Sequence, residues 1–349
     1  MRKKILITGG LGFLGSHLVN LLREDCEIVV LDKLSRFGDE PEDVFYAQGN
    51  ILSTQEVRDV FKKYGPFETV YHLAAEMPDK SASDMLLWET NVRGTINVVK
   101  EAVKNKTESF IFTSSNVAYG IPKKLPVREE DPLNSLEIYG KSKAKAEKEL
   151  EGFRGKINTQ ILRCPVISGV GRLGLQSILF EFISENKNVY VLGDGSNKYQ
   201  FVDADDACDA LKLASTKKGF DVYNIGADEI LSLRQIYQKI IEYAGSNSKI
   251  ISLPNKPALI TLAILEKLNI SPLGVYQYSM IGRSLYMDTA KIKTKLHWKP
   301  RKTNLDTFID NYKWYIENKN SFKTLGSENV SSNRSLPKMG VFKLLKMIS

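Results

Sequence analysis

The first apolar run of the chain leads directly into three glycines spaced three residues apart. The short, largely apolar run Lys4–Thr8 is followed by Gly9-Gly10-Leu11-Gly12-Phe13-Leu14-Gly15, and apolar residues of 15–22 then recur at helical spacing. This pattern predicts a strand, a tight turn and a helix. In such a unit Gly9 permits the turn, Gly12 lets the backbone approach a pyrophosphate, and Gly15 lets the helix pack on the strand. The helix N-terminus presents N–H groups to phosphate, so the segment predicts a dinucleotide-binding loop that includes Phe13 and Leu14.

A carboxylate ends the next predicted strand. Glu27–Leu31 is a second buried-strand pattern, and Asp32 follows it. A carboxylate at this place accepts hydrogen bonds from the ribose hydroxyls of adenosine and repels a 2′-phosphate. Asp32 therefore predicts NAD rather than NADP, although the nearby Lys33 and Arg36 would weaken that preference. The alternative is that Asp32 is an ordinary turn residue.

Strand and helix patterns alternate through the first half of the chain. Trp88–Asn105 and Tyr139–Gly152 have helical spacing, and the further buried-strand patterns are Thr69–Leu73, Ser109–Thr113, Thr159–Leu162 and Val222–Ile225. Strands that alternate with helices pair in parallel. The fold class is therefore predicted to be α/β, a doubly wound parallel sheet (Rossmann) with helices on both faces.

The regular alternation breaks down after Arg163, which predicts a second, smaller domain. We expect an NAD-binding domain over residues 1–165, with 200–226 returning to it, and a mixed α/β substrate-binding domain over 166–199 and 227–317. The latter includes helical patterns at Leu233–Ala244 and Leu305–Glu317. Residues 318–349 are expected to form a basic tail, with a flexible linker over 318–335 and a short amphipathic segment over 339–348.

The net charge of +8 does not indicate a nucleic-acid partner, because it is concentrated at one end. From Asn318 onward six basic residues stand against Glu328 alone. The remaining charge is ordinary for a soluble enzyme. The three cysteines form no CxxC pair and no metal-ligand cluster with the three histidines, so we expect no metal and a reduced, cytoplasmic protein. No signal peptide and no apolar stretch of about 18 residues is visible.

Tyr139 and Lys143 lie four residues apart in a predicted helix. Residues at i and i+4 share a helix face, so the phenol and the ammonium are expected side by side. A neighbouring ammonium stabilises a phenolate, which makes tyrosine a usable general acid and base. Upstream, a buried run ends in Ser114 and Ser115, at the edge where an open α/β sheet places its site. We expect Ser115 to orient the reacting substrate oxygen toward Tyr139; the alternative is a Tyr–Lys pair on a solvated helix.

Further short motifs follow one another in order along the chain. They are Gly49-Asn50-Ile51, His72-Leu73-Ala74-Ala75, Asn91-Val92-Arg93-Gly94-Thr95, Thr113–Gly120, Leu162-Arg163, Gly193-Asp194-Gly195, Phe201–Asp206 and Leu296-His297-Trp298-Lys299-Pro300. With the glycine loop, Asp32 and Tyr139–Lys143, they resemble the extended short-chain dehydrogenases/reductases, in the NAD-dependent nucleotide-sugar epimerase/dehydratase branch. The resemblance covers residues 3–317.

The resemblance implies roles for individual residues. Ser115, Tyr139 and Lys143 would be the catalytic residues, and Lys143 would also touch the nicotinamide ribose. Asn50 would contact adenine, and Asn91 would support the site. The residues expected to contact NAD are Gly9, Gly12, Phe13, Leu14, Gly15, Asp32, Asn50, Ile51, Leu73, Ala74, Ala75, Asn91, Ser114, Tyr139, Lys143 and Pro165. A homodimer formed through a helix pair is also expected from the resemblance.

The sequence narrows the reaction without fixing the substrate. Dehydratases of the family carry an acidic residue just after the serine or threonine, whereas this chain has Asn116, so water elimination is disfavoured. Two readings remain: a nucleotide-sugar epimerase, and an NAD(H)-dependent dehydrogenase or ketoreductase acting on a small or steroid-like alcohol. A non-catalytic cofactor-binding protein is disfavoured by the intact Ser–Tyr–Lys set.

The predicted substrate residues include two departures from the family pattern. Val166 replaces an asparagine that meets the substrate diphosphate, and Tyr199 replaces an arginine. Arg172, Arg283 and Lys198 are candidates to supply the missing positive charge, or are solvated surface cations. The expected substrate contacts are therefore Ser115, Val166, Arg172, Tyr199 and Arg283.

The basic apolar segment 339–348 has two interpretations. As an amphipathic helix it would give weak peripheral attachment to an anionic membrane, which would suit a lipid-linked pathway. Alternatively it docks on the surface of the protein itself or of a partner subunit.

Overall fold

The structure is a computed structural model that describes residues 2–78, 83–255, 257–261, 280, 282–322 and 346. The chain divides into two compact units. The first comprises residues 1–165, 204–226 and 287–299, and the second comprises 166–203, 227–286 and 300–349. In the part of the chain that the structure describes, no helix combines the length and apolar character needed to span a bilayer.

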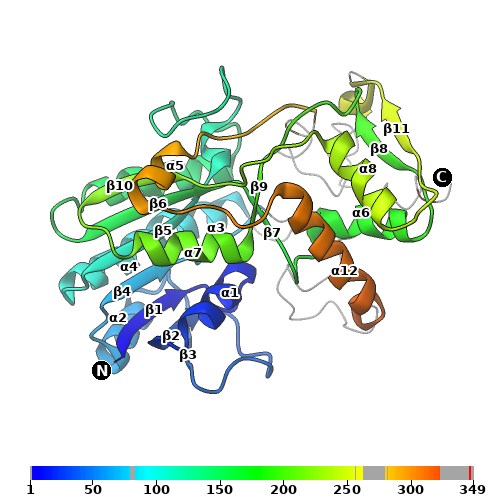
Figure 1. Ribbon diagram of the computed structural model, residues 1–349. Helices are drawn as coiled ribbons and strands as arrows, with labels where there is room; N and C mark the ends of the chain where they lie inside the picture. Colours follow the sequence, from blue (N-terminus) through cyan, green and yellow to red (C-terminus); the bar gives the residue numbers. More distant parts are fainter. Residues whose placement is uncertain are drawn as a thin grey trace. The chain divides into compact units, whose positions relative to one another are not determined.

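The first unit is built on a seven-stranded sheet in the order β10-β6-β5-β4-β1-β2-β3 (Figure 1). All neighbouring strands are parallel. The strands are β1 (Lys3–Thr8), β2 (Cys26–Asp32), β3 (Phe45–Gln48), β4 (Thr69–His72), β5 (Ser109–Ser115), β6 (Asn158–Cys164) and β10 (Phe220–Asn224). The strand order reverses at β1, which pairs with β2 on one side and β4 on the other. The predicted doubly wound parallel sheet is therefore confirmed.

Helices cover both faces of this sheet because successive strand residues point to opposite sides. On one face Leu6 and Val29 join a buried cluster with side chains of α2 (Thr54–Tyr64), α4 (Thr95–Lys104) and α5 (Ile138–Glu151). The buried Ile5 and Ile7 point to the other face. There α1 (Phe13–Leu22) contacts the sheet and α7 (Ala204–Ala214).

Three shorter helical elements complete the connections of the first unit. α3 (Asp84–Trp88) continues through the π-helical turn η1 (Glu89–Gly94) into α4, so the predicted helix Trp88–Asn105 is a composite. The 3₁₀ turn η2 (Asn116–Tyr119) directly follows β5. Glu137 caps the N-terminus of α5 by accepting the N–H groups of Tyr139 and Gly140.

Two boundaries differ from the sequence prediction. Residues 287–299, expected in the substrate domain, belong to the first unit, and 200–203, expected in the NAD domain, belong to the second. The physical reason is anchoring: α11 (Ala290–Leu296) contacts β10 and α7, and the buried Trp298 donates its Nε1–H to the Asp206 carbonyl at 3.0 Å. The strand β3 was missed, since only four residues form it and none is fully buried.

The second unit is mixed, as expected for the smaller domain. Its strands form two parallel pairs, β7 (Val166–Ser168) with β9 (Phe201–Asp203) and β8 (Val189–Leu192) with β11 (Ile250–Leu253). Its helices are α6 (Gly174–Ser184), α8 (Leu233–Tyr243) and α12 (Asn304–Phe322). Edge-to-face aromatic contacts of Phe180 with Phe308 and Tyr312 join α6 to α12.

The tail begins later than the sequence suggested. Because α12 continues to Phe322, residues 318–322 are helical rather than part of a linker. The rest of the predicted linker, 323–335, lies outside the described residues. So does the amphipathic segment 339–348, except Lys346.

Candidate active site

The glycine loop lies where the strand order reverses, which is the usual ligand position in such sheets. Gly9 has φ +75°, and a Cβ there would lie 2.7 Å from the backbone nitrogen of Ala74. A Cβ on Gly15 would lie 2.2 Å from the carbonyl oxygen of Gly9. Gly12 is the N-cap residue of α1 and provides no side-chain cap. Phe13, Leu14 and Gly15 form the first turn, whose N–H groups face the direction from which a pyrophosphate would approach.

Asp32 closes this loop from the end of β2. Its side chain is buried, and its carboxylate accepts the N–H groups of Leu11 and Leu34, each at 3.0 Å. Burial raises the pKa of Asp32 above the ordinary value. The two cations that would weaken the preference for NAD are paired with acids. Lys33 Nζ lies 2.5 Å from Glu76, and Arg36 pairs with Glu40.

The predicted cofactor residues Asn50 and Ile51 differ in exposure. Asn50 is exposed, and its side-chain oxygen accepts the Leu52 N–H at 2.9 Å, which leaves its amide N–H₂ for a ligand. Ile51 is 5% exposed and packs in the core, and its carbonyl accepts the Asn97 amide. Any cofactor contact by Ile51 would therefore be made by its backbone.

A chain of hydrogen bonds links the ends of β1 and β4 to α4, and the donor of each bond can be assigned. Thr95 Oγ1 donates to the Asn91 carbonyl, so it accepts from His72 Nε2 at 2.9 Å. The other ring nitrogen, Nδ1, then accepts from Thr8 Oγ1 at 2.7 Å. His72 is fully buried, and desolvation together with the nearby Lys143 charge lowers its pKa to about 3. The imidazole is therefore neutral and connects the end of β1 to α4.

Asn91 fixes the segment that follows β4. Its amide oxygen accepts the Glu76 N–H at 2.7 Å, and its amide nitrogen donates to the Glu76 carbonyl and to Ser142 Oγ. Leu73, Ala74 and Ala75 are half-buried in this segment. Asn91 is 1% exposed, and its hydrogen bonds join this segment to α5; that it supports the site stays a prediction.

Tyr139 and Lys143 lie on one face of α5, as predicted. Lys143 Nζ is 5.9 Å from the centre of the Tyr139 ring and donates to the Thr113 carbonyl of β5 at 2.9 Å. The lysine is 3% exposed, and burial lowers its pKa to about 8. Tyr139 is half-buried. The arrangement places a desolvated cation next to a phenol that remains accessible.

The two serines at the end of β5 have different surroundings. Ser115 Oγ accepts the Val117 N–H at 3.3 Å and so begins η2, on the strand that also positions Lys143. Ser114 donates its hydroxyl to Glu147 at 2.5 Å and is 2% exposed. A cofactor contact by Ser114 would therefore come from its backbone. Pro165, also predicted, is buried just after β6.

Four predicted substrate residues belong to the second unit. Val166 is 38% exposed at the start of β7, and Arg283 is exposed. Tyr199 is buried against Phe201, and its carbonyl accepts the Asn304 amide. Arg172 is half-buried. Tyr199 therefore replaces the expected arginine by a packed aromatic side chain.

The loop, the carboxylate and the Tyr–Lys pair together define a class of protein. The glycine cradle and Asp32 fit the pyrophosphate and the ribose of a dinucleotide, and the Ser115, Tyr139 and Lys143 side chains fit proton transfer at an alcohol or carbonyl. A doubly wound sheet with these groups is typical of nicotinamide-dependent oxidoreductases.

Comparison with known proteins narrows this class. The model of the NAD dependent epimerase/dehydratase family matches residues 5–226. The chain is 36% identical over 347 residues to the uncharacterised protein y4nG of Sinorhizobium fredii, covering 98% of this chain and 85% of that protein. It is 31% identical over 249 residues to the N-acetyl-alpha-D-glucosaminyl-diphospho-ditrans,octacis-undecaprenol 4-epimerase of Escherichia coli O157:H7, covering 69% of this chain and 72% of that one.

This chain is also similar to a solved epimerase structure. The UDP-glucose 4-epimerase of Thermotoga maritima, determined with UDP-glucose, has a TM-score of 0.76 and 25% identity, covering 90% of this chain and 99% of that chain. The chain belongs to the NAD-dependent epimerase/dehydratase family, and its cofactor is accordingly NAD. The resemblance inferred from the motifs is therefore confirmed.

Proposed function

We propose that this enzyme is a nucleotide-sugar 4-epimerase that removes a hydride from a sugar hydroxyl carbon and returns it to the opposite face. The observation that carries the proposal is the buried Lys143 ammonium beside the accessible Tyr139, at the end of the strand that bears Ser115. The likeness to a UDP-glucose 4-epimerase structure supports a UDP-hexose as substrate.

Each side chain has a defined task in this proposal. Tyr139 as phenolate accepts the hydroxyl proton of the sugar and later returns it, and the Lys143 charge stabilises the phenolate between these steps. Ser115 hydrogen-bonds the reacting oxygen. Bound NAD supplies the hydride acceptor and, in its reduced form, the donor. Asn116 follows Ser115 where an eliminating enzyme would need a carboxylate.

The binding roles predicted from sequence are part of the proposal. Substrate recognition is assigned to Val166, Arg172, Tyr199 and Arg283, and Asn50 and Asn91 complete the cofactor contacts. We also propose a homodimer. The exposed Met85 and Leu86 on α3 support it, because they offer apolar surface beside the composite helix. Light scattering coupled to gel filtration tests this assignment, and a monomeric mass would refute it.

One assay separates epimerase from dehydrogenase. The purified protein is incubated with UDP-galactose or UDP-glucose without added cofactor, and both the epimer and NADH absorbance are followed. Epimer formation without net NADH supports the proposal. Formation of stoichiometric NADH with no epimer would instead support the hypothesis of a dehydrogenase or ketoreductase. Tyr139→Phe should abolish turnover, and a fully active variant would refute the assigned role of Tyr139.

A sugar carried on a polyprenyl diphosphate is a second candidate substrate. The basic apolar sequence of 339–348 favours it, and so does the likeness to an epimerase of that substrate class. Opposing it, Lys346 pairs with Glu181 and Glu185 of α6, which favours docking on the protein itself. Deletion of residues 336–349 followed by co-sedimentation with anionic liposomes decides: undiminished binding would exclude a membrane role for the segment.

A further inference from the structure

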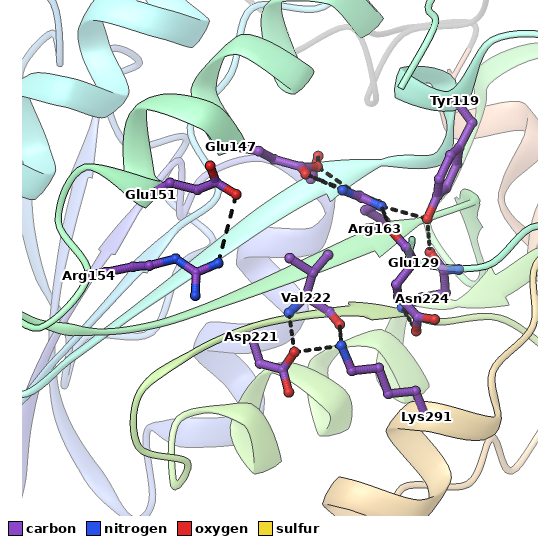
Figure 2. A network of polar contacts seen from close by, with 11 residues as sticks. Tyr119, Glu129, Glu147, Glu151, Arg154, Arg163, Asp221, Val222, Asn224 and Lys291 are labelled. Carbon is purple, nitrogen blue, oxygen red and sulfur yellow. Dashed lines mark hydrogen bonds and ion pairs between the residues drawn. The ribbon is translucent and has the colours of Figure 1, made fainter. Parts of the chain in front are cut away.

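A buried polar network lies behind the catalytic side chains of the first unit. It runs from Glu147 on α5 through Arg163 on β6 and Tyr119 in η2 to Asn224 on β10 (Figure 2). All four residues are at most 6% exposed. None of them contributes to the proposed chemistry, so their connection needs a separate explanation.

In the ion pair at the centre of the network, all three guanidinium nitrogens of Arg163 have hydrogen-bond partners. Arg163 Nη2 lies 2.6 Å from one Glu147 oxygen, and Nε lies 3.1 Å from both oxygens. The remaining terminal nitrogen, Nη1, donates to the Tyr119 hydroxyl at 2.7 Å and to the Glu129 carbonyl at 2.8 Å. This fork-like geometry fixes orientation as well as distance, because a guanidinium is planar and rigid.

The network binds residues that precede and follow Ser115 in the sequence. On one side, Ser114 donates its hydroxyl to Glu147 at 2.5 Å. On the other, Tyr119 ends the turn that Ser115 begins, and its hydroxyl accepts from Arg163 and donates to Asn224 at 2.7 Å. The position of Ser115 is therefore tied to Glu147 from two directions.

The same glutamate is tied to the acid/base pair. Tyr139, Lys143 and Glu147 follow one another at intervals of four residues, so they share one face of α5. Lys143 in turn donates to the Thr113 carbonyl, two residues before Ser115 on β5. The Ser114–Glu147 bond therefore fixes the axial register of α5 against β5 one turn beyond Lys143.

We propose that the Glu147–Arg163 pair is a positioning device that holds Ser115 in register with Tyr139 and Lys143. This inference rests on the proposed epimerase function. A buried ion pair contributes little net stability compared with apolar residues of similar volume, because both charges must leave water. Its contribution here is geometric: it fixes β5, which supplies Ser115, and the turn η2 that follows it against α5, which supplies Tyr139 and Lys143.

Glu147 also acts on the charge of Lys143. The titratable groups that face Lys143 in the described residues are Tyr139 and Glu147 on α5, His72 on β4 and Cys164 on β6. Burial raises the pKa of Cys164 to about 12, so its thiol is neutral. Cys164 and Glu147 are the groups that counteract the lowering of the Lys143 pKa, and with the thiol neutral this leaves the Glu147 carboxylate as the charged one. Loss of this carboxylate should therefore shift the alkaline limb of activity to lower pH.

The test uses one conservative change, one apolar replacement of the whole pair and one matched control. Glu147→Gln keeps the side-chain shape but removes the charge. Glu147→Leu with Arg163→Met removes both charges together, and apolar replacement of a buried ion pair preserves folding stability because no charge is left unpaired. Glu101→Gln is the control, because Glu101 is also buried and ion-paired, with Arg58 and Lys104 on α2 and α4.

We expect Glu147→Gln to lower kcat by about tenfold to a hundredfold with KM changed by less than about threefold, because misplaced groups slow chemistry more than binding. The double variant should regain the melting temperature of the wild type without regaining kcat. Glu101→Gln should lower the melting temperature and leave kcat near the wild-type value. Recovery of kcat in the double variant, or an unchanged kcat in Glu147→Gln, would overturn the proposal.

A second readout does not depend on turnover. The ultraviolet difference spectrum between each protein and its Tyr139→Phe counterpart follows ionisation of this phenol alone. We expect the phenolate to form at higher pH in Glu147→Gln than in the wild type, because the variant places Lys143 less well. Coincident titration curves would overturn the inference even if the wild type had no epimerase activity, whereas an inactive wild type by itself contradicts only the proposed function.

Discussion

Titration of Lys143 gives the sharpest prediction about activity. Burial lowers its pKa from 10.5 to about 8, which corresponds to about 3 kcal/mol by which the interior disfavours the ammonium. The cation is therefore present below pH 8 and is lost as the pH rises through that value. Since the phenolate of Tyr139 depends on this cation, kcat should be constant near neutrality and fall above about pH 8.

The expected size of the fall in kcat follows from the pKa of Lys143. One pH unit above the pKa about a tenth of the lysine remains protonated, so kcat at about pH 9 should be roughly tenfold below its plateau. Two titratable neighbours, the His72 imidazole and the Cys164 thiol, do not change their charge around pH 8. His72 has its pKa near 3, and Cys164 near 12.

The assay is the initial rate of UDP-glucose formation from saturating UDP-galactose between about pH 6 and pH 10, with Lys143→Arg as the comparison. Arginine stays protonated throughout this range, so the variant should lose the alkaline limb whatever its plateau. A wild-type rate that stays flat to about pH 9.5 would refute the reasoning. So would the same alkaline limb in Lys143→Arg.

Two substitutions and one titration test the glycine loop, Asp32 and the buried His72. Asp32→Asn should raise the dissociation constant of NADH by about tenfold to a hundredfold, since hydrogen bonds to a charged group are worth about 1.5–3 kcal/mol; calorimetric titration with NADH and NADPH measures it, and an unchanged NADH constant would contradict the role of the carboxylate. Gly15→Ala should lower both the melting temperature and NADH affinity, because the new Cβ would lie 2.2 Å from the Gly9 carbonyl oxygen; wild-type binding would show that the turn can move. The His72 imidazole should show no titration by NMR between about pH 5 and pH 8, as its pKa is lowered to about 3; a midpoint in that range would disprove the neutral hydrogen-bond chain.

Local pattern was sufficient for the elements that carry the cofactor. β1, the turn at Gly9 and α1 follow from apolar spacing and glycine positions, and Asp32 marks the end of β2. These features depend on residues close together in sequence, where steric rules act directly. The pairing of Tyr139 with Lys143 followed for the same reason, since helix geometry alone brings i and i+4 together.

Features that depend on distant partners were not predictable in this way. Ser114 was predicted to contact NAD, and nothing local in the sequence shows that its hydroxyl bonds to Glu147, thirty-three residues away. Arg163 was recognised only as part of a motif, and nothing local shows that its partner is Glu147. The one available signal was the position of Glu147, one turn beyond Lys143 on the face of α5 that must be buried.

Two later segments of the chain, residues 204–226 and 287–299, complete the first unit, and this order affects folding during synthesis. The N-terminal 165 residues supply six of the seven sheet strands, whereas β10 and α11 come from later segments. A chain emerging from the ribosome therefore exposes β6 as an unpaired sheet edge until Phe220–Asn224 has been made, and Trp298 cannot bond to Asp206 until later still. At ordinary elongation rates the interval between residue 165 and residue 224 lasts roughly three to twelve seconds, during which that edge is open to wrong partners. The discontinuous architecture thus makes the last segments of the first unit the protective ones for the nascent protein.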